Sequence, residues 1–177
     1  MKYEGRVEGL YNNGRKCPTL RCDLEGIIAD SHHGFTKKAD IRDRPIPKGK
    51  IIRNWRQWSA VSQEELTQIA HNLSLPKVTP EQLFANICFS GIPDLTQLPR
   101  GSRIIFPSEL ILSVEEDNEP CMKPATEVKR QNPDFNPSQF MIGAWGLRGL
   151  VGVVHYPGSM SQGDQVLVEV AYPKTYG

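Results

Sequence analysis

Proline and glycine recur along the whole chain, and this feature limits the length of every helix and strand it can form. The 177 residues include 14 prolines and 15 glycines, more than the roughly 12% that the two types together average. Proline removes a hydrogen bond from a helix interior, and glycine favours turns. This excludes a bundle of long helices and predicts short elements joined by many turns. Hydrophobic residues make up 38% of the chain, which is enough for one core at this length.

Apolar and polar residues alternate over several short stretches, as is typical of β-strands. We expect strands over residues 2–11, 24–28, 50–61, 87–89, 103–106, 110–115, 150–156 and 165–172. The segment 157–164 is expected to be a connection. With no internal repeat and no convincing boundary, the sequence predicts a single domain over residues 1–177. Its class is expected to be mainly β, a closed or open β-barrel decorated by about three short helices.

Capping residues and apolar spacing predict the three helices. The first helix is predicted to begin at Ser62, which is a favourable N-cap residue and has Glu65 at the capping-box spacing. Apolar residues at positions 66, 69, 70 and 73 then fall on one face of this helix. Thr79 before Pro80 predicts a second helix that runs to residue 85. Asn136 before Pro137 predicts a third over residues 137–147, and the preceding residues from 129 are expected to be loop.

Charge and the ends of the chain exclude some classes of function. Lys and Arg number 21 and Asp and Glu number 20, a net charge of +1. A balance this even argues against a nucleic-acid coat and against a polybasic membrane binder. The N-terminal residues lack the apolar stretch of a signal peptide, and no apolar run approaches the ~20 residues of a membrane helix. The expected location is the cytoplasm, with neither nucleic acid nor a membrane as partner.

The even charge hides one strongly basic segment, residues 36–56. Its net charge is +6, because it holds eight cations and two anions. The cations are Lys37, Lys38, Arg42, Arg44, Lys48, Lys50, Arg53 and Arg56. One interpretation is a solvated basic face. The other is a site for an anionic group such as phosphate, which the planar guanidinium of arginine binds with two hydrogen bonds.

Two groups of side chains raise the question of a metal site. Cys17 and Cys22 precede His32 and His33, but two adjacent histidines on an extended chain point to opposite sides, which disfavours structural zinc. Five carboxylates between residues 109 and 119 lack the pattern of a calcium loop and are interpreted as an exposed strand end.

Cys121 is the best nucleophile or soft-metal ligand among the four cysteines. It lies in a loop after a predicted strand, between Pro120 and Pro124 and near Lys123. A thiol in a polar loop near cations is accessible and has its thiolate favoured. Cys88, by contrast, has the pattern of a buried strand residue.

Several motifs, in their order and spacing, resemble the MOSC domain, which is named for the C-terminal part of molybdenum cofactor sulfurases. They include Glu119-Pro120-Cys121, Leu147-Arg148-Gly149 with the strand after it, Pro157-Gly158 and Gly163-Asp164. Asn86-Ile87-Cys88-Phe89-Ser90-Gly91 and Leu98-Pro99-Arg100-Gly101-Ser102 add to the resemblance. Asp30-Ser31-His32-His33-Gly34 and Arg53-Asn54 look like motifs of the small stand-alone bacterial members.

The resemblance implies a β-barrel-like fold and a role in sulfur handling. It assigns Cys121 as the residue that carries a persulfide or ligates molybdenum, and His33, Arg53, Asn54 and Arg148 as the lining of an anionic pocket for molybdenum cofactor. Implied partners are a cysteine desulfurase or another sulfur donor, and the cofactor or a metal–sulfur acceptor. The chain is too short for the pyridoxal-phosphate domain of the full sulfurases, so it is not expected to generate sulfur itself.

Two other functions stay open at this point. One is a molybdenum-dependent oxidoreductase component that reduces N-hydroxylated compounds, with Cys121 as metal ligand. The other is a non-catalytic module that binds an anionic partner through the basic segment. Whether the chain is an enzyme, as a sulfur transferase or an oxidoreductase component, is therefore left undecided by the sequence.

Overall fold

The computed structural model describes residues 1–172, and they form 13 strands, three α-helices and two 3₁₀ turns. The strands are β1 (Lys2–Asn12), β2 (Arg15–Cys17), β3 (Thr19–Asp23), β4 (Gly26–Ile27), β5 (Thr36–Lys38), β6 (Ile51–Arg53), β7 (Trp58–Ser62), β8 (Ile87–Ser90), β9 (Arg103–Ile105), β10 (Ile111–Asp117), β11 (Leu150–Tyr156), β12 (Gly158–Ser161) and β13 (Gln165–Glu169). The helices are α1 (Gln63–Asn72), α2 (Met122–Gln131) and α3 (Ser138–Gly143), and the 3₁₀ turns are η1 (Ile41–Asp43) and η2 (Leu95–Gln97).

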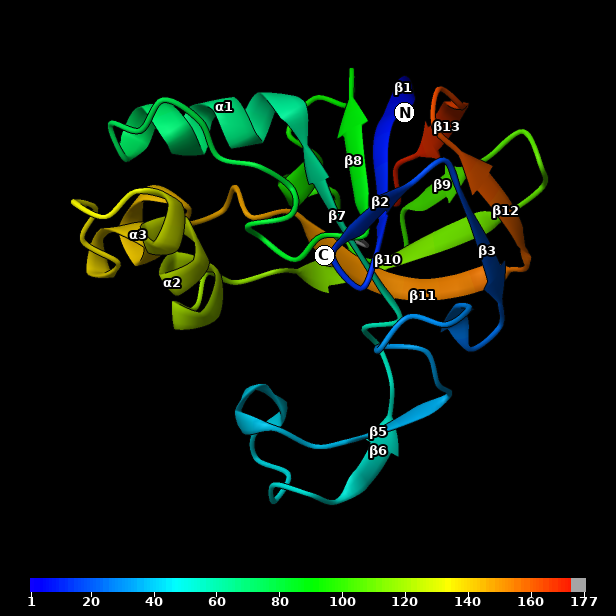
Figure 1. The fold of residues 1–177 in the computed structure, drawn as a ribbon. Helices are drawn as coiled ribbons and strands as arrows, with labels where there is room; N and C mark the ends of the chain where they lie inside the picture. Colours follow the sequence, from blue (N-terminus) through cyan, green and yellow to red (C-terminus); the bar gives the residue numbers. More distant parts are fainter. Residues whose placement is uncertain (173–177) are drawn as a thin grey trace, which may run out of the picture.

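Seven strands close into a barrel, which confirms the mainly β class (Figure 1). Around the barrel they follow the order β1, β13, β9, β10, β11, β7 and β8, and β8 pairs with β1 again. Only β7 and β8 are parallel among these pairs. The closing pair places residues 2–6 opposite residues 165–169. β2 extends the sheet beyond β1, and β3, β4 and β12 form a separate small sheet.

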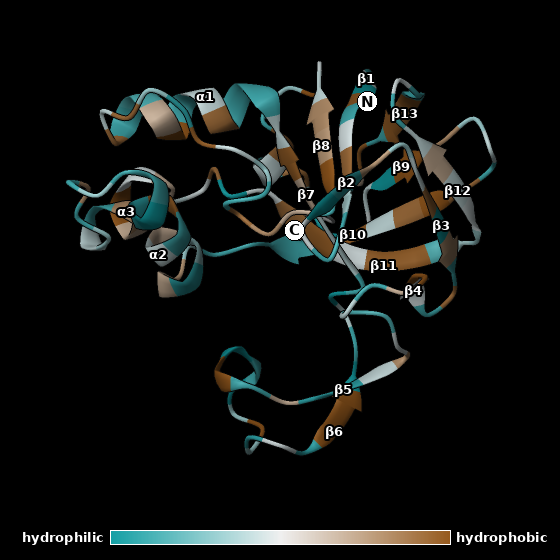
Figure 2. Ribbon diagram, in the orientation of Figure 1, coloured by the Kyte–Doolittle hydropathy of each residue, from teal (hydrophilic) through white to brown (hydrophobic). Residues whose placement is uncertain are grey.

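Two apolar cores hold this architecture together. One fills the barrel with side chains from opposite strands, among them Leu10, Phe89 and Val168, each fully buried. The other lies between the outside of the barrel and the helices, where Ile69 of α1 and Val128 of α2 are fully buried. Figure 2 shows the apolar residues on the barrel strands, and the three helices on one side of the barrel. No helix of residues 1–172 is long and apolar enough to cross a membrane.

The helix predicted after Ser62 is confirmed. The Ser62 hydroxyl accepts a hydrogen bond from the Glu65 amide at 3.1 Å. The Glu65 carboxylate does not turn back to complete a capping box. It accepts instead from the amide and hydroxyl of Thr96, at 2.9 and 2.8 Å, and so ties α1 to η2.

The helix predicted over residues 79–85 is wrong, although its capping residues do pair. The Gln82 carboxamide oxygen accepts from the Thr79 amide at 2.8 Å, but the segment forms only turns. The reason lies at Phe84, whose φ of 57° is left-handed and incompatible with helix continuation.

The loop predicted over residues 129–138 is confirmed only for residues 132–137, because α2 occupies Met122–Gln131 and α3 begins at Ser138. The third predicted helix is present as α3 but ends at Gly143, and the Asn136 carboxamide oxygen accepts from the Ser138 amide at its start. A short strand, β12, occupies part of the predicted connection 157–164.

Residues 36–53 leave the barrel entirely. Their two strands, β5 and β6, pair only with each other, and Figure 1 shows them projecting from one end of the barrel as a hairpin. This excursion is the basic segment that the sequence singled out.

Gly152 in the middle of β11 allows the closest approach of neighbouring strands. A Cβ atom there would lie 2.0 Å from the Ser113 carbonyl oxygen and 2.5 Å from the Trp58 ring. We expect Gly152→Ala to lower the free energy of unfolding by about 3 kcal/mol. Overpacking costs roughly 1–3 kcal/mol, and the atom that would have to move here, the Ser113 carbonyl oxygen, belongs to the backbone of a paired strand. Urea denaturation measures this. Gly14→Asn, at a turn where φ is +77° but a Cβ meets nothing within 4 Å, should cost clearly less than Gly152→Ala, because asparagine tolerates the left-handed region. A wild-type midpoint for Gly152→Ala would contradict the packing described.

Candidate functional site

Cys121 stands at the N-terminus of a helix and at the wall of a cavity. It follows β10 and is the cap residue of α2, with extended backbone at φ −147° and ψ 171°. Its half-buried thiol side chain lines a cavity of about 120 Å³. The cavity is lined by His32, Arg42, Arg56, Trp58, Ser59, Leu83, Phe84, Asn86, Asn118, Cys121, Lys123, Arg148 and Val151.

Among residues 1–172 the lining is cationic and includes no carboxylate. Arg42 comes from η1, Arg56 from the end of the basic segment, Lys123 from α2 and Arg148 from the turn before β11. The N-terminus of a helix also favours negative charge, because its first amides have no partner within the helix. The cavity therefore fits an anion, or a thiolate together with an anionic ligand.

Arg148 is the most deeply buried of these cations. It is 6% exposed, and its Nη1 donates to the Asn118 carboxamide oxygen at 2.7 Å and to the Glu119 carbonyl oxygen at 2.6 Å. Burial lowers the pKa of Arg148 to about 10, with Arg56 and Arg42 adding to the effect and Cys121 opposing it. The guanidinium is still charged at neutral pH, so the chain holds a buried cation without a carboxylate beside it.

Asn118 holds two guanidinium groups with one oxygen. Its Oδ1 accepts from Arg148 Nη1 and from Arg56 Nη2, both at 2.7 Å. Arg56 also donates from Nη1 to Glu116 at 2.7 Å, on the side away from Asn118. Two like charges are thus fixed side by side at the cavity wall.

Two buried donors at this cavity lack a partner within residues 1–172. They are Nε of Arg148 and Nε1 of Trp58, whose side chain is 1% exposed. Buried donors without a hydrogen bond are rare in native structures and are explained by an absent water, ion or ligand. Their presence in one cavity supports a ligand that brings acceptor atoms.

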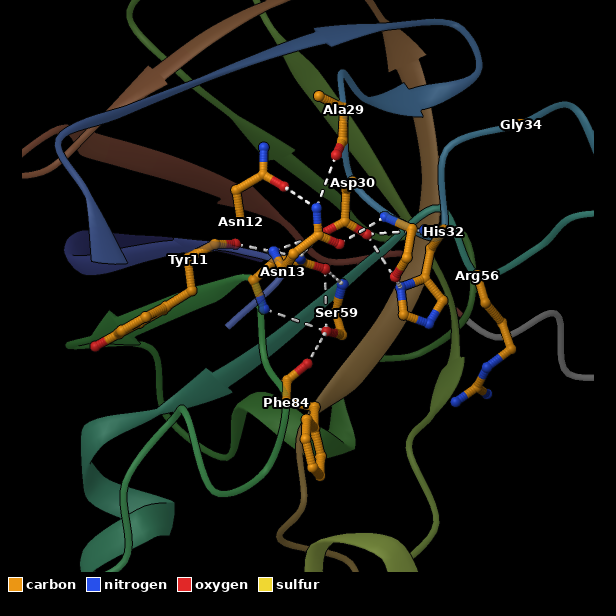
Figure 3. Close-up of polar contacts among 12 residues, drawn as sticks. Tyr11, Asn12, Asn13, Ala29, Asp30, His32, Gly34, Arg56, Ser59 and Phe84 are labelled. Carbon is orange, nitrogen blue, oxygen red and sulfur yellow. Dashed lines mark hydrogen bonds and ion pairs between the residues drawn. The ribbon is translucent and has the colours of Figure 1, made fainter. Parts of the chain in front are cut away.

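A buried polar network supports another part of the cavity wall (Figure 3). Asp30, 7% exposed, accepts from the His32 amide at 2.9 Å, from the Asn86 carboxamide at 2.9 Å and from the Asn13 amide at 3.3 Å. It also pairs with His32 Nδ1 at 3.0 Å. Asn86 in turn accepts from the amide and hydroxyl of Ser59, at 3.0 and 3.2 Å. His32, Ser59 and Asn86 all line the cavity, so the network fixes them in place.

The residues predicted for the site separate into three groups. Cys121 and Arg148 share the cavity. His33 and Asn54 line an adjoining hollow of about 340 Å³, which meets the cavity at His32, Arg42 and Arg56. Arg53 lines neither, because its guanidinium donates to the Phe35 carbonyl oxygen at 2.8 Å and stacks on the Phe35 ring at 3.7 Å.

Within the adjoining hollow, two predicted residues already have strong partners. His33 Nε2 lies 2.9 Å from Asp23 Oδ1. The Asn54 carboxamide donates to the carbonyl oxygens of His32 and Gly34, at 2.8 and 3.0 Å, and so holds the 32–34 loop.

Sequence reasoning missed four residues of the cavity wall: Arg42, Arg56, Trp58 and Asn118. Arg42 and Arg56 were visible as members of the basic segment, but nothing distinguished them from its other six cations. Asn118 stands among carboxylates in the 109–119 stretch, and only the fold shows that it accepts from two arginines.

The other three cysteines and the histidines do not assemble into a metal centre. Among residues 1–172 no group of three or more His, Cys, Asp or Glu side chains is placed to hold a metal. Burial raises the pKa of Cys22 and of Cys88 to about 12, and it also raises the pKa of Cys17. These thiols are therefore poor nucleophiles at neutral pH.

Comparison with known proteins points to one family. The sequence model of the MOSC domain matches residues 47–167. YuaD of Bacillus subtilis (strain 168), described provisionally as a metal-sulfur cluster biosynthesis protein, is 42% identical over 171 residues, covering 92% of this chain and 89% of YuaD. The crystal structure of YuaD superposes with a TM-score of 0.95 at 39% identity, over 97% of this chain and 99% of that one. YiiM from Escherichia coli shares the fold, with a TM-score of 0.65 at 15% identity over 98% of this chain and 72% of that one.

The network around Asp30 has a testable dependence on pH. Burial alone would raise the pKa of Asp30, but hydrogen bonds from His32 and Asn13 outweigh it and the pKa lies below the ordinary value. The charged carboxylate therefore stabilises the fold above the unfolded pKa of about 3.9, and this contribution is lost as the pH falls through the lower native pKa. We expect Asp30→Asn to reduce the free energy of unfolding by about 2 kcal/mol at pH 7, with the difference from wild type shrinking below about pH 4. Urea unfolding at several pH values measures this, and a difference that does not change with pH would contradict it.

Proposed function

The chain belongs to the MOSC domain family, and on that premise we propose that it binds an anionic ligand beside Cys121 and carries sulfur on this cysteine for metal–sulfur chemistry. The observation that carries the proposal is the position of the thiol. Among residues 1–172 it shares one cavity, free of carboxylates, with three guanidinium groups and the Trp58 side chain, and two buried donors of these groups, Arg148 Nε and Trp58 Nε1, have no partner. A persulfide and its transfer partners are anionic, and this lining suits both.

The proposed transfer is an exchange between sulfur atoms. The Cys121 thiolate attacks the outer sulfur of a donor persulfide, a new S–S bond forms at Cys121, and the donor S–S bond breaks. The donor leaves as a thiolate, which takes up the proton released when the Cys121 thiol ionised. No external oxidant or reductant is needed, because the sulfane sulfur moves without a change in its oxidation state.

The description of YuaD supports the second half of the proposal, the delivery of sulfur to a metal–sulfur acceptor. We propose a cysteine desulfurase or another persulfide protein as the donor. Exchange between thiols requires a reducing compartment, so we propose that the protein works in the cytoplasm.

Molybdenum cofactor is a second proposed ligand of the same cavity. It carries a phosphate, which Arg42, Arg56 and Arg148 are placed to bind, and Cys121 offers a soft sulfur ligand. The two unpartnered donors at the cavity support a fit to such an anionic group. When bound, the cofactor would supply redox chemistry at molybdenum, while the residues of the chain hold and orient its anionic end.

Replacing the proposed sulfur carrier tests the function directly. Protein incubated with a low-molecular-weight persulfide such as glutathione persulfide should gain one sulfur atom by intact mass, and dithiothreitol should remove it. Cys121→Ser should gain none, because the attacking thiolate is missing. Cys88→Ser is the matched control and should load like wild type, since Cys88 is buried and its pKa is raised to about 12. Loading of Cys121→Ser at the wild-type rate would refute the carrier role.

Replacing the buried arginine tests the anion site separately from the thiol. We expect Arg148→Lys to weaken inorganic phosphate binding by about tenfold, because a lysine keeps the charge but loses the planar fork. Arg53→Ala, at a guanidinium outside the cavity, should bind phosphate like wild type, and so should Cys121→Ser. Calorimetric titration measures all three. Equal weakening by Arg53→Ala and Arg148→Lys would place the anion elsewhere on the basic segment.

A further inference from the structure

The excursion from the barrel has no core of its own. We call residues 35–56 the basic arm, and within it only Ala39 and Asn54 are buried. Its two strands have three residues each and pair with no other strand. A two-stranded hairpin alone is marginally stable in water. The arm therefore has the character of a surface that another molecule covers.

The two faces of the hairpin differ in what they present. Residues opposite each other in the pairing share a face, and the register places Lys37 opposite Ile52 and Lys38 opposite Ile51. Lys37 belongs to the inner face, since its side chain is only 20% exposed and pairs with Asp43 at 2.8 Å. Lys38 and Ile51 therefore belong to the outer face, where Ile51 is 65% exposed.

The outer face also carries an aromatic and arginine cluster. Thr36 lies opposite Arg53 in the register, two residues from the Lys38–Ile51 pair, so Arg53 shares that face. Its guanidinium lies 3.7 Å from the centre of the Phe35 ring and 5.1 Å from that of Trp55. Both rings are exposed, at 55% and 45%. Exposed aromatic residues around an arginine are the side chains that dominate protein–protein binding energy.

Charge indicates what kind of partner fits this face. Lys38, Arg44, Lys48 and Lys50 form no ion pair with any residue in the range 1–172, whereas Lys37, Arg42 and Arg56 are all paired with carboxylates. The unpaired cations favour an acidic partner. They disfavour a second copy of the arm, which would bring the same positive charge, and the net charge of +1 for the whole chain disfavours nucleic acid.

We propose that the outer face of the basic arm docks the protein that delivers sulfur to Cys121, through acidic residues around that protein's persulfide. The proposal rests on the proposed function. Its basis is placement: Thr36, which the register puts on the same face as Lys38 and Ile51, lines the hollow that meets the Cys121 cavity at Arg42 and Arg56, so a protein seated on this face reaches the hollow beside the thiol. A lipid surface offers the same negative charge, but it has no persulfide to bring to the cavity.

The test compares a protein donor with a small one. Sulfur loading is followed by intact mass with a cysteine desulfurase and cysteine, and separately with glutathione persulfide. The variant is the pair Lys38→Glu and Ile51→Glu, two exposed residues of the outer face that do not line the cavity. The matched control is the pair Lys77→Glu and Ile142→Glu, which makes the same changes at exposed positions outside the arm.

We expect the arm variant to load about tenfold more slowly from the desulfurase, because charge complementarity sets association rates, and at the wild-type rate from glutathione persulfide. The control variant should match wild type with both donors. Higher salt should slow only the protein donor.

Each other result overturns the proposal in a recognisable way. Unchanged loading of the arm variant from the desulfurase removes the docking role and leaves the carrier function standing. The same conclusion follows if the unmutated protein loads from glutathione persulfide but not from the desulfurase. Loss with both donors shows damage to the site and not to docking. Wild-type protein that loads from neither donor refutes the carrier function and the docking proposal together. A membrane is the alternative partner. It would be assigned to the arm if the unmutated protein co-sediments with vesicles of phosphatidylcholine and phosphatidylglycerol, the arm variant does not, and the arm variant still loads from the desulfurase at the wild-type rate.

Discussion

The pairing of β1 with β13 is the constraint on which the rest of the structure depends. It closes an open sheet into a barrel, so that the strands of the ring have no free edge between them. Within this ring β10 pairs with β11 and places Asp117 opposite Leu150, so Asn118, directly after β10, lies near Arg148, two residues before β11. The pair that forms one wall of the cavity is thus held by backbone hydrogen bonds of the barrel and not by a flexible loop. A site on rigid elements keeps its donors in place before any ligand arrives.

Asn118 then joins the barrel to the basic arm. Its single oxygen accepts from Arg148, which belongs to the barrel, and from Arg56, which ends the arm. Without this shared acceptor the two guanidinium groups would repel each other at close range. With it, they present a doubly cationic wall to Cys121, whose position at the N-terminus of α2 adds further positive potential. The cavity is therefore assembled from three parts of the fold, the barrel, the basic arm and α2.

Local sequence signals predicted the elements that local interactions control. The cap at Ser62 and the strand over residues 150–156 were found as expected, because each depends on neighbours within a few residues. At α3 the cap residue is Pro137 and not the predicted Asn136, whose carboxamide oxygen accepts from Ser138. Two incorrect predictions also have local causes. The left-handed backbone of Phe84 stops the helix that Thr79 and Pro80 would start. The sequence did not predict α2, because this helix contains a proline and few apolar residues. The cavity could not be predicted in the same way. Its key contacts join Asp30 to Asn86 and Arg56 to Asn118, pairs that are far apart in sequence and that only the closed barrel brings together.

The closing pair has a consequence for how the protein is made. Among the strands of the ring β1 is synthesised first, and its last partner is formed by residues 165–169. Until those residues have been synthesised, one edge of β1 stays open and the ring cannot close. The barrel therefore closes late relative to the synthesis of β1, and the intervening elements have to shield that edge until its partner arrives.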